Sequence, residues 1–276
     1  MAVYSHSRLS TFEQCKLKYK FRYIDKIIPD IEKTIESHLG SIVHATLEWL
    51  YNEVRKKRIP TVDEMIVEYS RNWQEDWEDE IPVVRRDMSI KDYFNKGVKF
   101  LIDYYLKHEP FDDNTIAVEK EIFVSLDKEG KYKIRGFIDR LVYNMETGEY
   151  EIHDYKTSGR LPSEENVEND RQLALYSIAI KERFNVEKGI ILVWHYLSFN
   201  KKIESRRTEE QLEKLKENTI NLIKEVESTI NFTPTKSSLC NWCEYKSICP
   251  VWGNRPPEKQ MTLEEFNRMD KSYELD

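Results

Sequence analysis

Residues 131–157 alternate apolar and polar side chains on both sides of a polar turn, which predicts two antiparallel β-strands joined as a hairpin. If the hairpin is symmetric about that turn, Asp139 lies directly opposite Asp154. Side chains on a strand alternate faces, so both carboxylates point to one face and Lys156 joins them two residues further on. Like charges facing each other destabilise a sheet, and a divalent cation between them would remove that repulsion. The hairpin therefore predicts a metal site with a lysine beside it.

Composition limits the class of protein. Of the 276 residues, 39% are hydrophobic and 34% are charged, which predicts one domain with insertions and a charged helical surface. No apolar run approaches the roughly 18 residues of a membrane span, and the N-terminus lacks an apolar secretion core. We therefore expect no membrane association and a cytoplasmic location.

The net charge of −7 argues superficially against a nucleic-acid partner, but the charge is unevenly distributed. Residues 61–114 hold 14 acids and 7 bases, so the rest of the chain is neutral overall. The first 30 residues carry six bases and three acids, interleaved with aromatic residues. Cations and rings of this kind are typical of a groove for single-stranded nucleic acid, and an ordinary amphipathic helix is the alternative.

Periodicity predicts a mixed α/β fold with a central sheet covered by helices. A helix is expected from Ser7 or Ser10 to about Ile28, and another over 41–58, opened by Gly40. Residues 61–108 look like an all-helical insertion broken around Pro82. The remaining expected elements are a strand over 116–124, the hairpin, a helix over 168–184, a strand over 189–197 and a helix over 209–230.

The cysteines have a spacing that suits a metal centre. Cys240, Cys243 and Cys249 lie in one short segment, and Cys15 can join them only if the two ends of the chain meet. Structural disulfides are uncommon in a reducing compartment. Four thiolates suit either zinc or an iron–sulfur cluster, and four unrelated buried thiols are the remaining alternative.

Six segments, taken in order, resemble the PD-(D/E)XK nucleases of the RecB type. The likeness extends to the iron–sulfur branch that includes the nuclease domain of AddB and the CRISPR-adaptation-associated exonucleases. It runs from Ser5 to Pro250, and the 61–108 insertion is not part of it. The segments are residues 5–21, Gly40-Ser-Ile-Val-His44, Gly136-Phe-Ile-Asp139-Arg140, Asp154-Tyr-Lys156-Thr157, Gln172-Leu-Ala-Leu-Tyr176 and the cysteine segment.

The resemblance implies a restriction-endonuclease-like fold in which His44, Asp139, Asp154 and the backbone carbonyl of Tyr155 bind Mg²⁺ or Mn²⁺. It makes Lys156 the catalytic lysine. The residue chemistry agrees, because carboxylate oxygens suit hard cations and an ammonium group beside the scissile phosphate favours added negative charge. Without the resemblance, the two acids could equally belong to a surface ion pair and a solvated strand edge.

Three further residues are candidates. Gln172 and Tyr176 share one helix face and would position the DNA backbone or the attacking water, with plain packing as the alternative for Tyr176. Glu121, on the strand before the hairpin, is an additional acid near the metal or, as the favoured alternative, part of a solvated face.

For the cysteines, the resemblance implies a [4Fe–4S] cluster held by Cys15, Cys240, Cys243 and Cys249, in which residues 239–253 close onto Cys15. We expect this cluster to act as a structural clamp within a single nuclease domain of residues 1–276 rather than as a redox centre.

The resulting functional hypothesis is a metal-dependent deoxyribonuclease, an exonuclease that hydrolyses single-stranded DNA or DNA ends in repair, recombination or defence. The second hypothesis is a cluster-stapled module that binds DNA ends and partners a helicase or a CRISPR integrase, with little catalytic role. Electron carriage by the cluster is a third, and it leaves the two acids and Lys156 unexplained.

Overall fold

The computed structural model describes residues 3–254, apart from 30, 32, 78–80, 84, 86 and 187. The expected insertion and the acidic run within it are therefore described only in part. The chain divides into two compact units, the first made of residues 1–9 and 33–228 and the second of residues 10–32 and 229–276. The sheet belongs to the first unit and the four cysteines belong to the second.

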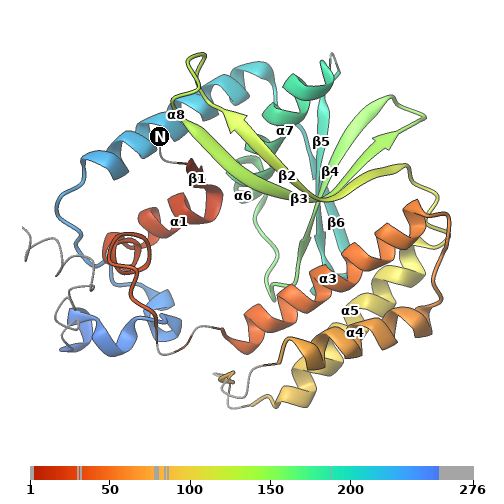
Figure 1. Cartoon of the computed structure of the whole chain (residues 1–276), viewed down its shortest axis with the longest axis horizontal. Coiled ribbons are helices and arrows are strands. Elements are labelled where there is room, and N and C mark those ends of the chain that lie inside the picture. The colour runs from red at the N-terminus through yellow and green to blue at the C-terminus, as the bar shows by residue number, and fades with distance from the viewer. Residues whose placement is uncertain are drawn as a thin grey trace, which may run out of the picture. The chain divides into compact units, whose positions relative to one another are not determined.

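A mixed, six-stranded sheet forms the centre of the first unit (Figure 1). The strand order is β1-β3-β4-β5-β6, and β2 pairs with the other edge of β3. β1 with β3 and β4 with β5 are parallel, whereas the remaining pairs are antiparallel. The strands are β1 (Val3–Ser5), β2 (Thr115–Ser125), β3 (Lys133–Asn144), β4 (Glu149–Lys156), β5 (Ile190–Tyr196) and β6 (Lys201–Ser205).

Helices cover both faces of this sheet, which confirms the expected restriction-endonuclease-like architecture (Figure 1). The side chains of β4 show the two faces, because Asp154 bonds to Gln172 of α7 while the next residue, Tyr155, contacts Tyr104 of α5. The helices are α1 (His6–Gln14), α2 (Lys16–Tyr19), α3 (Ile35–Arg55), α4 (Val62–Glu75), α5 (Ile90–His108), α6 (Glu164–Glu168), α7 (Arg171–Phe184) and α8 (Glu209–Ser228).

Helices α4 and α5 lie within the expected 61–108 insertion and pack on α3. Each begins with a capping box, formed by Thr61 with Glu64 and by Ser89 with Asp92. Their inward faces are aromatic: Tyr69, Tyr93 and Tyr104 are all 2% exposed or less. The three helices therefore share one apolar core, in which Tyr155 of β4 is also buried.

Two expected helix starts are wrong. Gly40 does not open a helix, because α3 begins at Ile35 behind Thr34, whose hydroxyl accepts a hydrogen bond from the Ser37 amide. Gly40 lies inside α3, where a Cβ would stand 3.4 Å from Thr157 Oγ1, so its small size lets the helix approach the end of β4. The first helix likewise begins earlier than Ser7, with the Ser5 hydroxyl accepting from the Arg8 amide.

The periodicity of the sequence did not predict two of the strands. β1 has only three residues, and β6, Lys-Lys-Ile-Glu-Ser, is an edge strand with charged side chains. Both form because neighbouring strands offer open backbone groups: β1 pairs with residues 133–135 of β3, and β6 pairs with β5. Their local sequences carry no strand signal of the expected length.

In the second unit, the expected first helix breaks at Cys15, whose extended backbone separates α1 from α2. A π-helical turn, Lys20–Ile24, follows. The rings of Phe12, Tyr19 and Phe21 are at most 2% exposed, and Tyr19 stacks on Phe232 with 6.4 Å between centroids. These rings build a core rather than a platform for nucleobases, which supports the amphipathic-helix interpretation.

Candidate active site

The hairpin opens into a fork at the two aspartates. β3 and β4 pair from Asn144–Glu149 as far as Arg140–His153, the register that the symmetric hairpin predicts. Beyond that point β4 continues beside β5, with Asp154, Tyr155 and Lys156 paired to residues 194–196. Asp139 and Asp154 therefore stand where the two strands separate, on neighbouring strands, as the sequence predicts.

Asp154, Lys156 and Gln172 form a closed set of contacts that we call the lysine triangle. Lys156 Nζ lies 2.7 Å from Asp154 Oδ2 and donates a hydrogen bond of 3.3 Å to Gln172 Oε1. Gln172 Nε2 donates in turn to Asp154 Oδ1, also at 3.3 Å. Asp154 is 3% exposed, so this triangle fixes a buried carboxylate next to a cation.

His44 joins α3 to the opposite side of the fork. Its Nε2 donates a 2.7 Å hydrogen bond to the backbone carbonyl of Tyr155, and its Nδ1 lies 3.3 Å from Asp139 Oδ2. The same Asp139 oxygen accepts a 2.9 Å hydrogen bond from the Tyr155 amide. Three of the sequence-predicted metal ligands, His44, Asp139 and the Tyr155 carbonyl, thus lie in mutual contact.

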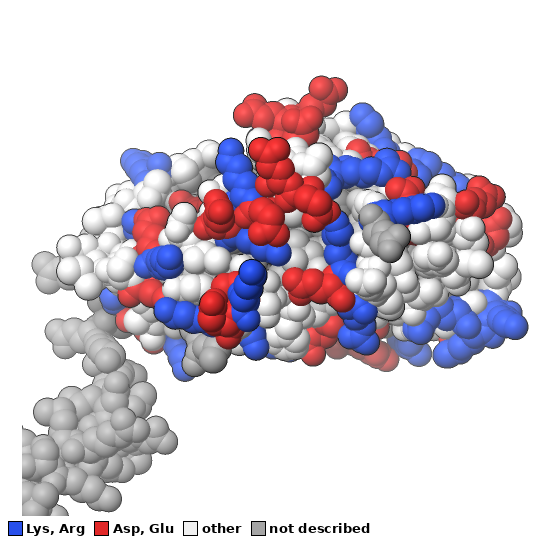
Figure 2. Space-filling view, turned by 90° about the horizontal axis from the view of Figure 1, so that it is seen from above, with Lys and Arg blue, Asp and Glu red and all other residues white. Residues whose placement is uncertain are grey.

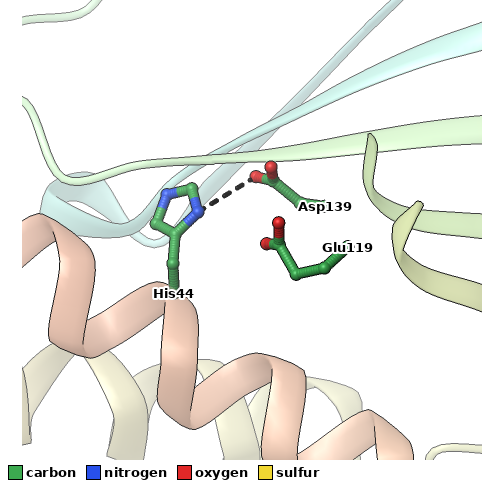
Figure 3. A group of neighbouring side chains, drawn as sticks. All are labelled: His44, Glu119 and Asp139. Carbon is green, nitrogen blue, oxygen red and sulfur yellow. Dashed lines mark ion pairs between the residues drawn. The ribbon is translucent and has the colours of Figure 1, made fainter. Parts of the chain in front are cut away.

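Glu119 is a third acid of the site, which the sequence analysis missed. Ligand atoms of His44, Glu119 and Asp139 all lie within 4.8 Å of one another, and we call these three residues the ligand group. Figure 3 shows the His44 ring rising from α3 toward the two carboxylates. Asp154 is not a member of the ligand group, although its charge acts on both acids of the group.

The strand register explains the position of Glu119. Val118 pairs with Arg140 and Lys120 with Ile138, so Glu119 stands opposite Asp139. The residue suggested from sequence, Glu121, is 43% exposed through its side chain and forms a 2.5 Å ion pair with Arg135, as its solvated alternative predicts. Extending the hairpin reasoning to β2 would have required the length of the turn before β3, which the sequence pattern does not fix.

Burial and repulsion from neighbouring acids raise the pKa values of the two acids in the ligand group. Burial, followed by the charge of Asp139, raises the pKa of Glu119 to about 7. Burial and the charge of Asp154 raise the pKa of Asp139 as well. Carboxyl groups with raised pKa values give up protons readily when a cation arrives, because the cation replaces the protons as the compensating charge.

The residues present fit a hard divalent cation. They offer carboxylate oxygens, one imidazole and one backbone carbonyl, a donor set suited to Mg²⁺ and, through the imidazole, to Mn²⁺. Asp154 adds a further carboxylate beside this set, and its Oδ2 is paired with the Lys156 ammonium at 2.7 Å. Besides burial, its charge raises the pKa values of both Glu119 and Asp139, so a cation bound here would offset the repulsion among three acids.

Tyr176 packs tightly at the base of the fork. A Cβ on Gly136 would lie 2.2 Å from the Tyr176 ring, so glycine is required for α7 to approach β3 here. Burial raises the pKa of the Tyr176 hydroxyl, an effect that its hydrogen bond with Gln172 partly offsets. Tyr176 therefore both packs against Gly136 and contacts Gln172 of the lysine triangle.

His6 is a second residue near the site that sequence reasoning did not select. Burial, then the positive charges of Arg171 and Lys156, lowers the pKa of His6 to about 4. Its imidazole is therefore neutral at pH 7 and stands close enough to Lys156 to sense its charge. The only sequence signal was its position at the start of the first motif.

A buried polar network lies behind Tyr155, on the α5 side of the sheet. Its centre is Arg140, which is 1% exposed and whose Nε donates to Tyr155 Oη at 3.0 Å. The other Arg140 nitrogens reach Asp113, Thr115 Oγ1 at 3.2 Å and His153 Nδ1 at 2.8 Å. The network holds the strand whose backbone carbonyl faces His44, which makes it a scaffold for the site.

The four cysteines lie together in the second unit. All four line one small cavity, together with Lys18 and Lys246. Backbone amides of Lys18 and Thr235 donate to Cys15 Sγ at 3.5 Å, and the Ser237 amide donates to Cys240 Sγ at 3.3 Å. Burial raises the pKa of the Cys243 thiol, and a bound cation would favour the thiolate, which is the form that binds metal.

Metal affinity at the ligand group should depend on pH. Because the pKa values of Glu119 and Asp139 are raised, both carboxyls retain protons near neutrality in the metal-free protein. We expect Mn²⁺ affinity, measured by isothermal titration calorimetry, to rise at least about tenfold between pH 6 and 8. Stability of the metal-free protein should fall over pH 4.5 to 7, since a raised acid pKa penalises the ionised folded state.

The matched pair for this prediction is Glu119→Gln and Glu121→Gln. The first should weaken Mn²⁺ binding by at least about tenfold, whereas the second, which removes an exposed acid from the same strand, should leave it unchanged. Equal Mn²⁺ affinity in the two variants would show that Glu119 is not a metal ligand.

None of the helices in the described part of the chain has the length and apolarity to cross a membrane.

Comparison with known proteins agrees with this geometry. The family model of the PD-(D/E)XK nuclease superfamily matches residues 3–250. A crystal structure of a candidate exonuclease from Eubacterium rectale has a TM-score of 0.50 and 13% sequence identity, covering 96% of this chain and 92% of that one. A crystal structure of the protein SSO0001 has 18% identity and a TM-score of 0.37, covering 78% and 94% of the two chains. No curated protein sequence matches the chain.

Because the family match spans most of the chain, the protein belongs to the PD-(D/E)XK nuclease superfamily. Membership implies a nuclease that uses divalent metal ions, and the ligand group supplies a candidate site for them. The structural likeness to the Eubacterium rectale protein, at 13% identity, supports the fold.

Proposed function

We propose that the protein is an exonuclease of the RecB and AddB type, which hydrolyses single-stranded DNA or DNA ends with Mg²⁺ or Mn²⁺. The observation that carries the proposal is the fork at which the ligand group and the lysine triangle meet. The likeness in fold to a candidate exonuclease adds support for action at ends.

In this proposal His44, Glu119, Asp139, Asp154 and the Tyr155 carbonyl hold the cation. When bound, the cation lowers the pKa of its water and neutralises charge that develops on the phosphate. Lys156 supplies a second positive charge. Burial alone would lower its pKa, but the charge and hydrogen bond of Asp154 raise the pKa above its ordinary value. Lys156 is therefore a protonated electrostatic group rather than a general base.

Gln172 keeps Lys156 in place. Its amide oxygen accepts from the ammonium group and its amide nitrogen donates to Asp154, so the lysine side chain cannot swing away without losing its contacts with both Gln172 and Asp154. Tyr176, one helical turn further along α7, fills the space against Gly136 and holds that face of the helix against β3. Gln172 and Tyr176 are positioning residues in this mechanism.

The experiment that tests the proposal compares linear and covalently closed circular single strands, labelled and incubated with Mn²⁺ or Mg²⁺. We expect the linear strand to be digested to short products, the circle to survive, and EDTA to stop digestion. Asp139→Asn should lose the activity, and Asp103→Asn, an α5 acid paired with Lys99, should keep it. Digestion of the circle at the same rate as the linear strand would mean that the protein is an endonuclease. Digestion in the presence of EDTA would contradict a metal-dependent mechanism.

We also propose that the four cysteines bind a [4Fe–4S] cluster, which staples the second unit. All four cysteines line one small cavity, which supports a shared centre. Four thiolates suit either zinc or an iron–sulfur cluster, and the resemblance to the iron–sulfur branch of the family favours the cluster. Residues 239–253 would then close onto Cys15, within a nuclease domain of residues 1–276 in which 61–108 is an insertion.

Anaerobic purification tests the cluster. We expect brown protein with about four iron atoms per chain. Asp154→Ala should retain the iron and lose digestion, whereas Cys240→Ser should lose the iron, since one of four ligands is removed. Stoichiometric zinc without iron in the anaerobic protein would assign the cysteines to a zinc site.

The cellular role follows from the proposed activity. A cytoplasmic enzyme that shortens DNA ends would serve repair, recombination or defence, with a helicase or a CRISPR integrase as its partner. A DNA-end-binding module with little catalysis is the second candidate function. The two functions differ in one outcome: the biological activity of the binding module would survive the loss of Lys156.

A further inference from the structure

A cavity of about 600 Å³ lies along β2, away from the residues of the ligand group and the lysine triangle. Among the strands that the structure describes, β2 pairs only with β3, so one edge of this strand is open to them. We call the cavity the β2 groove. Its lining comes from the end of α3, from β2, from the tip of the β3–β4 hairpin and from the end of α7: Arg55, Asn114, Ile116, Ala117, Val118, Lys120, Ile122, Leu141, Tyr143, Tyr150, Ile180, Arg183 and Phe184.

The charge of the β2 groove has one sign. Arg55, Lys120 and Arg183 line it, and no acid does. Within the described part of the chain, none of the three is in an ion pair. Figure 2 shows one face of the molecule, on which cations and acids are intermixed, and the chain as a whole has a net charge of −7. Three unpaired cations around an apolar cavity in an acidic protein favour an anionic occupant.

Aromatic rings form one wall of the groove. Tyr143 and Tyr150 have ring centroids 5.0 Å apart, and Tyr150 stacks on Phe184 at 4.9 Å with an interplanar angle of 25°. Phe184, the last ring of this stack, is 40% exposed. The Arg183 guanidinium lies over the Phe184 ring, 5.8 Å from its centroid, so a nucleobase would pack on this exposed pair of ring and cation.

The backbone of β2 disfavours a peptide added as a further strand. Its register shifts between Thr115 and Ala117, and Glu119 has a φ of +43°. Bulges and an edge lysine such as Lys120 are the features by which natural sheets prevent strand addition. The occupant is therefore recognised through side chains, which suits phosphates and bases better than an extended peptide.

We propose that the β2 groove binds a segment of the DNA strand beyond the cleavage site, with its phosphates on Arg55, Lys120 and Arg183 and a base on Phe184. Val118 and Lys120 of the groove flank Glu119 of the ligand group in β2, so one strand of the sheet joins the two sites. This inference rests on the proposed DNA substrate and adds the site that grips it.

The test uses the full chain with Ca²⁺ in place of Mn²⁺, and measures binding of a fluorescent 20-nucleotide single strand at several salt concentrations. The double variant Arg55→Gln, Arg183→Gln should bind about tenfold more weakly. The slope of log affinity against log salt should be shallower by about 1.4, since each lost phosphate contact on a single strand contributes about 0.7. Phe184→Leu should weaken binding at every salt concentration without changing the slope.

The matched control is Lys91→Gln, Lys214→Gln, which removes two exposed cations outside the groove and should bind as the wild type does. Hydrolysis of bis-p-nitrophenyl phosphate, a diester too small to reach the groove, should be unchanged in the double variant when Mn²⁺ is present. If the wild type binds the strand but cuts no DNA, and the double variant loses that binding, the proposed function fails and the groove is retained.

Three outcomes overturn the inference. The first is unchanged affinity and salt slope in the double variant of a protein that cuts DNA. The second is the absence of strand binding by the wild type. The third is a polyglutamate peptide that binds the wild type but not the double variant, while strand binding stays equal in both, because the groove would then accept an acidic peptide.

Discussion

Replacing Lys156 by alanine should slow DNA cleavage by at least about a hundredfold while DNA affinity stays within about twofold of the wild type. Lys156 is the cation of the lysine triangle, and its raised pKa keeps it protonated at neutral pH. Its charge contributes most where negative charge grows on the phosphate, so its loss raises the barrier rather than weakening binding. Single-turnover cleavage of an end-labelled strand and fluorescence anisotropy in Ca²⁺ measure the two quantities.

The control for this prediction is Lys128→Ala, which removes an exposed lysine from the turn between β2 and β3. It should cut and bind as the wild type does. Thermal unfolding of both variants separates a catalytic effect from misfolding, because Lys156→Ala also leaves Asp154 without its ammonium partner. Cleavage by Lys156→Ala at the wild-type rate would favour the DNA-end-binding module or place the catalytic charge elsewhere.

Arg140→Leu should lower the free energy of unfolding by about 3–5 kcal/mol, the usual cost of removing one partner of a buried ionic network. Arg140 is 1% exposed, bonds to Tyr155, Asp113, Thr115 and His153, and lies 4.1 Å above the Tyr51 ring. Leucine fills part of the volume but removes the donor that these four polar side chains share. Urea unfolding followed by tryptophan fluorescence measures the change.

Arg135→Leu is the matched control on the same strand. Arg135 is 53% exposed through its side chain and pairs with Glu121 at the surface, so its loss should cost less than about 1 kcal/mol. If both variants unfolded at the same urea concentration, the buried network would not be a scaffold. Weaker Mn²⁺ binding in Arg140→Leu than in Arg135→Leu would connect the network to the Tyr155 carbonyl that it supports.

The site could be predicted from sequence to the extent that local rules placed it. The hairpin register that puts Asp139 opposite Asp154 follows from alternation and turn symmetry, and the observed pairing confirms it. Lys156 contacts Asp154 and Gln172, and the catalytic roles expected for these residues stay predictions. Glu119 was missed, since the register between β2 and β3 depends on a longer turn and a bulge that no sequence pattern specifies.

The sequence by itself determined the central hairpin, most of the longer helices and strands, and the residue types gathered at the fork, because these depend on short-range periodicity and turn chemistry. Only the tertiary structure decided that His44 meets the Tyr155 carbonyl, that Arg140 is buried behind the site, and that three cations converge on the β2 groove. Those contacts join residues distant in the chain, and they are set by how helices pack on the sheet rather than by any local pattern.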